Sequence, residues 1–215
     1  MTDTNCGRFI TFEGGEGAGK TTQLGLLSES LRCAGFPVLL TREPGGSNGA
    51  EEIRNLLVTG AIGRWDAISE ALLHFAARRD HVETKIKPAL EDGTWVLCDR
   101  FADSSMAYQG YGYGLGRERI EALQQFSIGE FLPDLTLIFD MPVEAGLARA
   151  AGRDEDKSRY EQLDIEFHER VRDGFREIAV AEPKRCIIVD AQDSVVAVQD
   201  GLRKAIVDRF DIDLA

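Results

Sequence analysis

Five short runs of apolar residues, rich in β-branched and aromatic side chains, recur along the chain. They are Phe9–Phe12, Val38–Thr41, Trp95–Cys98, Leu135–Phe139 and Cys186–Val189. Each run is apolar almost throughout instead of alternating with polar residues, which is typical of parallel strands covered on both faces. The pattern therefore predicts five buried strands.

Segments with helical periodicity lie between these runs. Three segments carry apolar stripes: Leu24, Leu27 and Leu31; Ile120, Leu123 and Phe126; and Leu202, Ile206 and Phe210. Two further helices are marked by Ile53, Leu56 and Leu57, and by Ala71, Phe75 and Arg78, which fall on one helix face. Gly35 and Pro37 predict the end of the first helix. The alternation of strand and helix predicts a single α/β domain over residues 1–215, a three-layer α/β/α fold with a five-stranded parallel sheet.

Two segments are predicted to be loops of unusual composition. Residues 109–116 (QGYGYGLG) are rich in Gly and Tyr, and residues 152–159 (GRDEDKSR) are densely charged without an apolar anchor. A charged run of this kind is usually a solvated loop. Its place after the fourth strand and its helix also allows a function, because ligands of open α/β sheets bind beyond the carboxyl ends of the strands.

The charge of the chain limits its partners. Among 215 residues, 25 are Lys or Arg and 37 are Asp or Glu, so the net charge is −12. An acidic chain of this kind is not expected to bind nucleic acid through a broad basic surface. A polyanionic ligand would instead have to be bound by a local cluster of Arg and Lys side chains.

The cysteines and the hydropathy of the chain indicate a cytoplasmic protein. Cys6, Cys33, Cys98 and Cys186 lie far apart without a CxxC pair or a zinc-like spacing, which favours reduced thiols. The N-terminus carries no apolar leader, and no apolar run approaches the roughly 20 residues that span a bilayer. No membrane association is therefore expected.

A phosphate-loop motif follows the first predicted strand. It matches G-x-x-x-x-G-K-[ST], with the strand before it and a helix after it, through Gly14, Gly15, Glu16, Gly17, Ala18, Gly19, Lys20 and Thr21. The glycines allow the backbone N–H groups to point at phosphate oxygens. Lys20 is expected to reach the β- and γ-phosphates of ATP, and the Thr21 hydroxyl to bind Mg²⁺. The switch and base-reading strings of GTPases, D-x-x-G and N-K-x-D, do not occur.

Arginines follow the other strands at the same predicted edge of the sheet. Asp99 and Arg100 directly follow the third strand, and Asp99 is the expected acidic residue on the Mg²⁺ side. Arg54 and Arg78 lie between the second and third strands. Because the planar fork of Arg suits a phosphate, these arginines predict an anionic substrate. Phe75, three residues before Arg78, could stack on a base, although a core position fits it nearly as well.

Taken together, the motifs resemble those of the bacterial thymidylate kinases, members of the phosphate-loop nucleoside-monophosphate kinase family. The matches run in order over nearly the whole chain: TFEGGEGAGKTT, TREPGGS, EEIRNLL, FAARRDH, LCDRFADSSMAYQGYG, PDLTLIFD and GLARA. The resemblance implies transfer of the γ-phosphoryl group of ATP to dTMP, with Mg²⁺, by a homodimer with a mobile lid at about residues 150–160.

The resemblance also implies roles for single residues. The ATP site would include Gly14–Thr22 and Arg149, and Lys20, Asp99, Arg100 and Arg153 would be catalytic. Mg²⁺ would be bound by Thr21 and Asp99. The dTMP site would comprise Glu16, Arg54, Phe75, Arg78, Arg100, Ser105, Tyr108 and Gln109. The family's stacking Phe aligns with His74, one position before Phe75. Phe75 is expected to be the ring that stacks on thymine, and His74 is the alternative. His81 and His168 are expected to be structural, without a constellation of partners.

The charged segment carries one further expectation. Some thymidylate kinases have a catalytic Arg in the phosphate loop where this chain has Gly17, and no Arg occurs from Gly14 to Thr21. Arg153 matches the lid arginine of relatives that lack the loop arginine, and it is expected to bridge the phosphates of ATP. Arg159 is expected to matter less.

Two other functions remain open at this point. The first is another nucleoside-monophosphate kinase with the same layout, which a panel of acceptors would reveal. The second is a non-catalytic ATP-binding module, which would release no ADP with dTMP.

Overall fold

The computed structural model describes residues 7–61, 63–152 and 159–214. At its centre is a parallel sheet with the strand order β2-β3-β1-β4-β5. The strands are β1 (Phe9–Gly14), β2 (Val38–Arg42), β3 (Trp95–Asp99), β4 (Leu135–Asp140) and β5 (Cys186–Asp190). All five predicted strands are confirmed, and each continues one or two residues past its apolar run at the carboxyl end.

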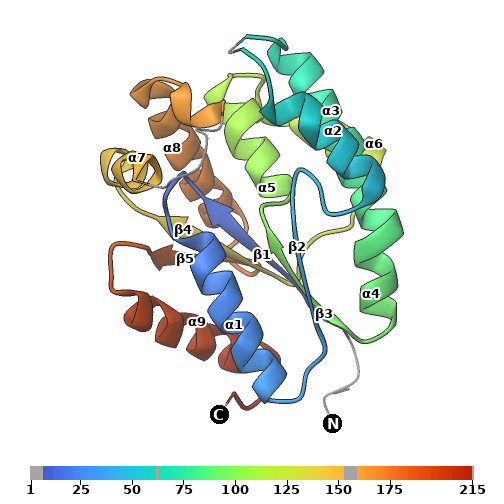
Figure 1. Ribbon diagram of the computed structural model, residues 1–215, viewed down its shortest axis with the longest axis vertical. Coiled ribbons are helices and arrows are strands. Elements are labelled where there is room, and N and C mark those ends of the chain that lie inside the picture. The colour runs from blue at the N-terminus through green and yellow to red at the C-terminus, as the bar shows by residue number, and fades with distance from the viewer. Residues whose placement is uncertain (1–6, 62, 153–158, 215) are drawn as a thin grey trace.

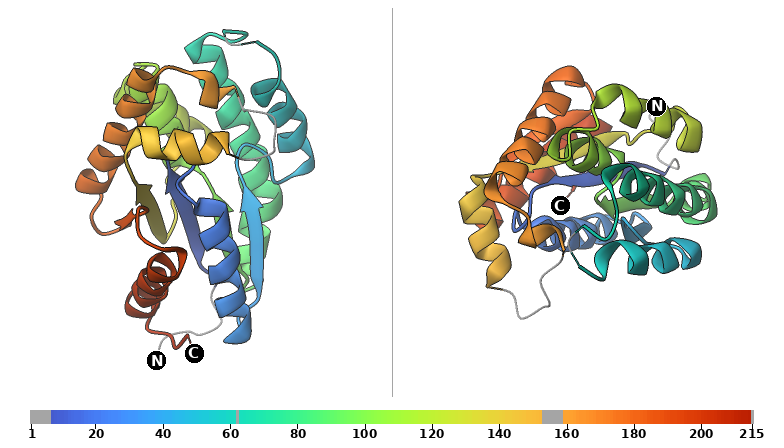
Figure 2. Two further views of the ribbon diagram at one scale, coloured as in Figure 1. Left: turned by 60° about the vertical axis from the view of Figure 1, so that its left-hand side comes forward. Right: turned by 90° about the horizontal axis from the view of Figure 1, so that it is seen from above.

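Helices cover both faces of this sheet, which confirms the three-layer α/β/α prediction (Figures 1 and 2). They are α1 (Lys20–Cys33), α2 (Asn48–Val58), α3 (Ala67–His81), α4 (Lys87–Glu91), α5 (Ala102–Ser105), α6 (Arg117–Ile128), α7 (Val143–Ala151), α8 (Ile165–Ala181) and α9 (Val195–Phe210). Three shorter helical turns are η1 (Val82–Ile86), η2 (Met106–Gly112) and η3 (Tyr160–Gln162). No helix in the described part of the chain is both long and apolar enough to cross a bilayer.

Helices α1 and α9 pack on one face of the sheet. The predicted stripes on both helices are buried, with Leu27, Leu31 and Ile206 fully inaccessible to solvent. Burial of one such side chain stabilises the fold by about 1.5–3 kcal/mol. Helix α1 ends at the predicted place, where Gly35 takes a φ of +89° that a residue with a side chain rarely adopts.

The other face of the sheet is covered mainly by α3, η2 and α8. Helix α8 is absent from the helices that the sequence analysis predicts, yet its periodicity is regular. Phe167, Val171, Phe175 and Ile178 recur at helical spacing and are all buried.

The predicted loop over residues 109–116 is wrong in its first half. Gln109–Gly112 continue a buried helical turn, η2, that packs closely against α8. A Cβ at Gly112 would lie 2.7 Å from the ring of Phe167. The glycines of this segment therefore serve close helix packing, and only residues 113–116 leave the helix.

One predicted apolar stripe is also partly wrong. Helix α6 buries Ile120 and half-buries Leu123, but Phe126 is 93% exposed. Six residues turn a helix by about 600°, which places Phe126 on a different face from Ile120. The inward position in the last turn belongs to Ile128.

Candidate functional site

The phosphate loop joins the carboxyl end of β1 to the first turn of α1. Within it, the Lys20 ammonium donates hydrogen bonds to the carbonyl oxygens of Gly14 (3.1 Å) and Gly15 (2.8 Å). Burial, together with the nearby Arg100 charge, lowers the pKa of Lys20 to about 8. A phosphate ligand would therefore meet a largely desolvated ammonium group at the start of a helix.

Gly17 leaves no room for a side chain in this loop. Its φ is +69°, and a Cβ there would lie 1.9 Å from the carbonyl oxygen of Gly146 in α7. An arginine at position 17 would thus collide with α7, so any cation that neutralises the transferred group has to come from another segment.

A cavity of about 360 Å³ opens over the phosphate loop. Its lining residues are Glu16, Gly17, Ala18, Gly19, Lys20, Thr21, Thr22, Asp99 and Arg100. The Thr21 hydroxyl donates a 2.9 Å hydrogen bond to Oδ2 of Asp99. A hydroxyl and a carboxylate are donors that suit Mg²⁺, which usually takes few protein ligands and completes its shell with water and phosphate oxygens. The two side chains therefore fit the predicted metal site.

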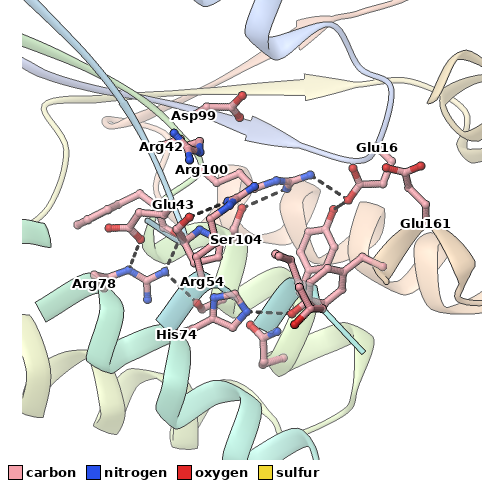
Figure 3. Close-up of a pocket in the computed structure, with 18 residues that line it drawn as sticks. Glu16, Arg42, Glu43, Arg54, His74, Arg78, Asp99, Arg100, Ser104 and Glu161 are labelled. Carbon is pink, nitrogen blue, oxygen red and sulfur yellow. Dashed lines mark hydrogen bonds and ion pairs between the residues drawn. The ribbon is translucent and has the colours of Figure 1, made fainter. Parts of the chain in front are cut away.

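A second cavity, of about 480 Å³, adjoins the first and has the size of a small-molecule site (Figure 3). Its lining residues are Glu16, Arg42, Glu43, Pro44, Arg54, Val58, Thr59, His74, Arg78, Asp99, Arg100, Phe101, Ser104, Ser105, Tyr108, Gln109, Tyr160 and Glu161. Every residue predicted for dTMP binding except Phe75 is among them. The two cavities share Glu16, Asp99 and Arg100.

Arg100 lies at the wall between the two cavities. Its guanidinium donates to the Gly14 carbonyl (3.0 Å) and to Oε1 of Glu16 (3.1 Å) and lies over the Tyr108 ring. Burial tends to raise the pKa of Glu16. The charges of Arg100 and Lys20 and the hydrogen bond from Tyr108 outweigh that effect, so this pKa lies below its ordinary value. Glu16 is therefore ionised and fixed at neutral pH.

The cavity has a second group of cations. Arg54 of α2 donates to the Pro44 carbonyl at 2.7 Å, and Arg42 pairs with Glu51 at 3.1 Å. Both arginines line the same cavity as Arg100. Arg42, Arg54 and Arg100 thus form a local positive cluster. An acidic chain needs such a cluster to bind an anionic ligand.

Arg78 of α3 is only 2% exposed and is held from several sides. Its Nε donates to Oε2 of Glu43 (2.8 Å), and its Nη2 donates to the Phe101 carbonyl and the Ser105 hydroxyl (2.9 Å each). The guanidinium also lies over the Phe75 ring, 4.7 Å from its centroid. Arg78 is thus a rigid, buried cation at the wall of the larger cavity.

The expectation that His81 has no constellation of partners is wrong. His81 is fully buried, with Nδ1 3.0 Å from Oε1 of Glu43 and Nε2 2.7 Å from the Thr41 hydroxyl. Glu43 therefore holds Arg78 with one oxygen and contacts His81 with the other. His168 is buried in α8, and its structural role stays a prediction.

The place expected for Phe75 is taken by His74. Phe75 is 3% exposed and packs in the core beneath Arg78, whereas His74 lines the cavity. Nε2 of His74 lies 2.9 Å from the Tyr160 hydroxyl. Burial and the charges of Arg78 and Arg159 lower the pKa of His74 to about 3. A neutral imidazole is therefore the ring that this wall of the cavity offers to a base.

Glu70 connects the cavity with the segment that follows α7. It accepts a 2.9 Å hydrogen bond from Nε2 of Gln109 and forms an ion pair with Arg159. Arg159 is 3% exposed, so it does not belong to a solvated loop. Removing it would leave the buried Glu70 without its cation, so substitution of Arg159 is expected to destabilise the fold.

Two arginines were predicted at the ATP side. Nη1 of Arg149 donates to the carbonyl oxygen of Ala191, directly after β5, at 2.9 Å. This contact places Arg149 beside the turn that follows β5. Arg153 lies outside the described residues, and its predicted contact with ATP stays a prediction.

Sequence reasoning missed Glu43, His81, Glu70 and Tyr160. Glu43 carried a visible signal, because it stands in the Arg42–Ser47 segment after a strand, where functional residues gather. The other three depend on contacts between distant segments, such as Tyr160 with His74. No local pattern predicts those contacts.

Comparisons with known proteins agree with this geometry. The family model described as thymidylate kinase matches residues 12–202. The chain is 50% identical over 206 residues to a thymidylate kinase of Caulobacter vibrioides, covering 96% of this chain and 99% of that protein. It is 54% identical over 205 residues to one of Rhodopseudomonas palustris, covering 93% and 88%. The crystal structure of thymidylate kinase from Ehrlichia chaffeensis superposes with a TM-score of 0.76 at 38% identity, covering 94% of this chain and 98% of that one.

Proposed function

The chain belongs to the thymidylate kinase family, and from that premise we propose that its two adjoining cavities bind ATP and dTMP. The reaction transfers the γ-phosphoryl group of ATP to dTMP and forms dTDP and ADP. The main support for this proposal is that the two cavities share one wall, formed by Glu16, Asp99 and Arg100. Donor and acceptor phosphates can approach each other only where the two cavities meet, and such positioning supplies much of the catalysis of phosphoryl transfer.

The phosphate-loop cavity is the proposed donor site. Residues Gly14–Thr22 surround the phosphates, and Lys20 neutralises charge between the β- and γ-phosphates as the bond breaks. Arg149 is assigned to the adenine side because it contacts the segment after β5. No general base is required, since the attacking oxygen of dTMP belongs to an ionised phosphate.

The larger cavity is the proposed acceptor site. Arg54 and Arg100 bind the phosphate of dTMP, and Glu16 faces the deoxyribose. Around thymine we place Arg78, Ser105 and Gln109, with Tyr108 crowding the 2′ side of the sugar. His74 replaces Phe75 as the stacking ring, because His74 lines the cavity and Phe75 does not.

Mg²⁺ is the proposed cofactor. Thr21 and Asp99 would hold it, and the ion would neutralise charge on the phosphates of ATP. The hydrogen bond between these two side chains keeps both oxygen donors together at the loop.

The assembly and location are also proposals. The chain acts as one catalytic unit, with a lid at about residues 150–160 and Arg153 as its phosphate-binding residue. We place it in the cytoplasm, where its nucleotide substrates occur. Free thiols at Cys33, Cys98 and Cys186 fit a reducing compartment. It forms a homodimer through α2, α3 and α6. Helix α3 packs against the other two, and the three helices expose Leu56, Leu72 and Phe126.

An acceptor panel tests this function. The purified chain with ATP and Mg²⁺ should release ADP fastest, in kcat/KM, with dTMP among the common nucleoside monophosphates. Lys20→Ala should lower kcat by at least about 100-fold, the effect of losing one preorganised charge contact. A better acceptor than dTMP would establish a different monophosphate kinase. No release of ADP with any acceptor would favour the non-catalytic ATP-binding module instead.

A further inference from the structure

Arg100 has a backbone conformation that is unusual for a residue with a side chain. Its φ is +68°, in the left-handed region, and Asp211 is the only other non-glycine residue with a positive φ in the described part of the chain. Such a conformation is unfavourable and persists only where the surroundings hold it. Strained residues of this kind gather at functional sites. The contacts that keep Arg100 in this conformation are therefore candidates for a functional role.

The strained turn sends three consecutive side chains in different directions. Asp99 points to the phosphate loop and accepts from Thr21, whereas Phe101 is fully buried against Phe9, with ring centroids 4.9 Å apart. Arg100 itself reaches the wall between the two cavities. A relaxed backbone at position 100 would move at least one of these side chains away from its place.

The turn is held from below by Glu13, the next-to-last residue of β1. Glu13 is fully buried, and its Oε1 accepts a 2.7 Å hydrogen bond from the backbone N–H of Phe101. Its Oε2 accepts a 2.5 Å hydrogen bond from the Ser104 hydroxyl, whose oxygen accepts in turn from Nη1 of Arg100 at 3.3 Å. One carboxyl group thus holds both the backbone after Arg100 and the side chain of Arg100.

We propose that Glu13 is a positioning residue for the transfer reaction, which holds Arg100 in its strained conformation so that the guanidinium meets the acceptor phosphate. The inference rests on the proposed function, in which Arg100 binds the phosphate of dTMP. Glu13 lines neither cavity and acts only through Phe101, Ser104 and Arg100.

The chemistry of Glu13 indicates which substitutions preserve this role. Burial, with the neighbouring Asp103 carboxylate, raises its pKa to about 7, so the carboxyl group is partly protonated near neutral pH. A neutral amide therefore replaces it closely. Glutamine keeps an acceptor for the Phe101 N–H and a polar contact with Ser104, whereas methionine keeps the length of the side chain and loses both.

Thr11 provides a matched control. It lies two residues earlier on the same strand and on the same face, is fully buried, and forms a 2.9 Å hydrogen bond with Thr136. Thr11→Val breaks a buried hydrogen bond of β1 at a place that does not contact Arg100. It therefore reports the destabilisation caused by a lost hydrogen bond of β1 while the hydrogen bonds of Glu13 and Arg100 stay in place.

The test compares Glu13→Met, Glu13→Gln and Thr11→Val by steady-state kinetics and thermal unfolding. We expect Glu13→Met to raise KM for dTMP by about 10-fold or more, because a small misplacement of a binding group is costly, and to change KM for ATP far less. Glu13→Gln should restore KM for dTMP to within about threefold of the parent. Thr11→Val should lower Tm without changing either KM. Equal effects of Glu13→Met and Thr11→Val on KM, or a Glu13→Gln enzyme as impaired as Glu13→Met, would overturn the proposal.

Two further variants separate this inference from the proposed function. If Glu13→Met does not fold, Ser104→Ala removes the link between Glu13 and Arg100, and it should raise KM for dTMP in the same selective way. In an Arg100→Ala background, Glu13→Met and Ser104→Ala should add nothing to the loss of dTMP affinity. Unchanged dTMP affinity in Arg100→Ala would contradict the proposed role of Arg100. Additive losses in that background would contradict only the role of Glu13.

Discussion

At the scale of single residues, Glu13 links the stability of the fold to pH. Its pKa in the folded chain is about 7, above the ordinary value of 4.5. The folded chain therefore holds a proton between these pH values that the unfolded chain has released. The stabilisation from that proton is complete below pH 4.5 and is lost as the pH rises to about 7.

This linkage predicts the behaviour of Glu13→Gln, which cannot titrate. As the pH rises from about 4.5 to about 7, the unfolding free energy of the parent should fall relative to that of the variant, and above pH 7 the difference should be constant. Urea unfolding at several pH values measures both curves. Parallel curves across this range would show that Glu13 has an ordinary pKa in the folded chain.

The predicted residues that line the phosphate-loop cavity are those with a local signal. Lys20 and Thr21 lie in a contiguous motif, and Asp99 and Arg100 directly follow an apolar strand, so their neighbours along the chain identify them. His81 has no such signal, because its partner Glu43 lies 38 residues away. The exchange of Phe75 for His74 has a similar cause. A difference of one residue turns a helix by about 100°, and only packing decides which ring faces the cavity.

At the scale of elements, the strands were predictable because burial on both faces removes polar residues from them. The outer strands β2 and β5 are nevertheless partly exposed, since each lies at an edge of the sheet. Helix α8 and the buried turn η2 were missed, although they pack closely against each other. Gly110 and Gly112 resemble loop residues along the sequence, and only the partner helix shows that they serve close packing.

The segment between α7 and η3 carries the prediction for Arg153. No arginine occurs in the phosphate loop, and Gly17 has no room for one, so the cation is expected from this segment. Arg153→Ala should lower kcat by about 100-fold or more and leave dTMP affinity nearly unchanged, because an arginine finger stabilises charge that develops during transfer. Steady-state kinetics with dTMP calorimetry measure both quantities.

The control for this prediction must be a cation whose removal leaves no buried charge. Arg159 fails this requirement because of its buried ion pair with Glu70. Lys184 is exposed between α8 and β5, so its removal leaves no buried charge. Lys184→Ala should change neither kcat nor the affinity for dTMP. A kcat of Arg153→Ala within about threefold of the parent would contradict the lid hypothesis.

At the scale of the whole molecule, the exposed apolar side chains of α2, α3 and α6 predict the assembly. Phe126 is 93% exposed and Leu72 is 51% exposed, on helices that pack against each other. A charge placed in such an interface has to be buried, so Phe126→Glu and Leu72→Glu should shift the chain from dimer to monomer in sedimentation.

The matched control lies on another helix. Val180 of α8 is 79% exposed, and Val180→Glu should leave the mass of the assembly unchanged. A parent chain that sediments as a monomer would contradict the dimer. Dimers that survive both substitutions in α3 and α6 would place the interface elsewhere.

Calorimetry of dTMP and ATP binding to Arg54→Ala and Arg100→Ala tests the central claim most directly, that the larger cavity holds the acceptor and the phosphate loop holds the donor. A charge-assisted hydrogen bond to a phosphate contributes about 1.5–3 kcal/mol, so each variant should bind dTMP about 10- to 150-fold more weakly. ATP affinity should stay within about threefold of the parent, most clearly for Arg54→Ala, because Arg54 lines only the larger cavity. Equal losses for both ligands, or unchanged dTMP affinity in both variants, would contradict this assignment.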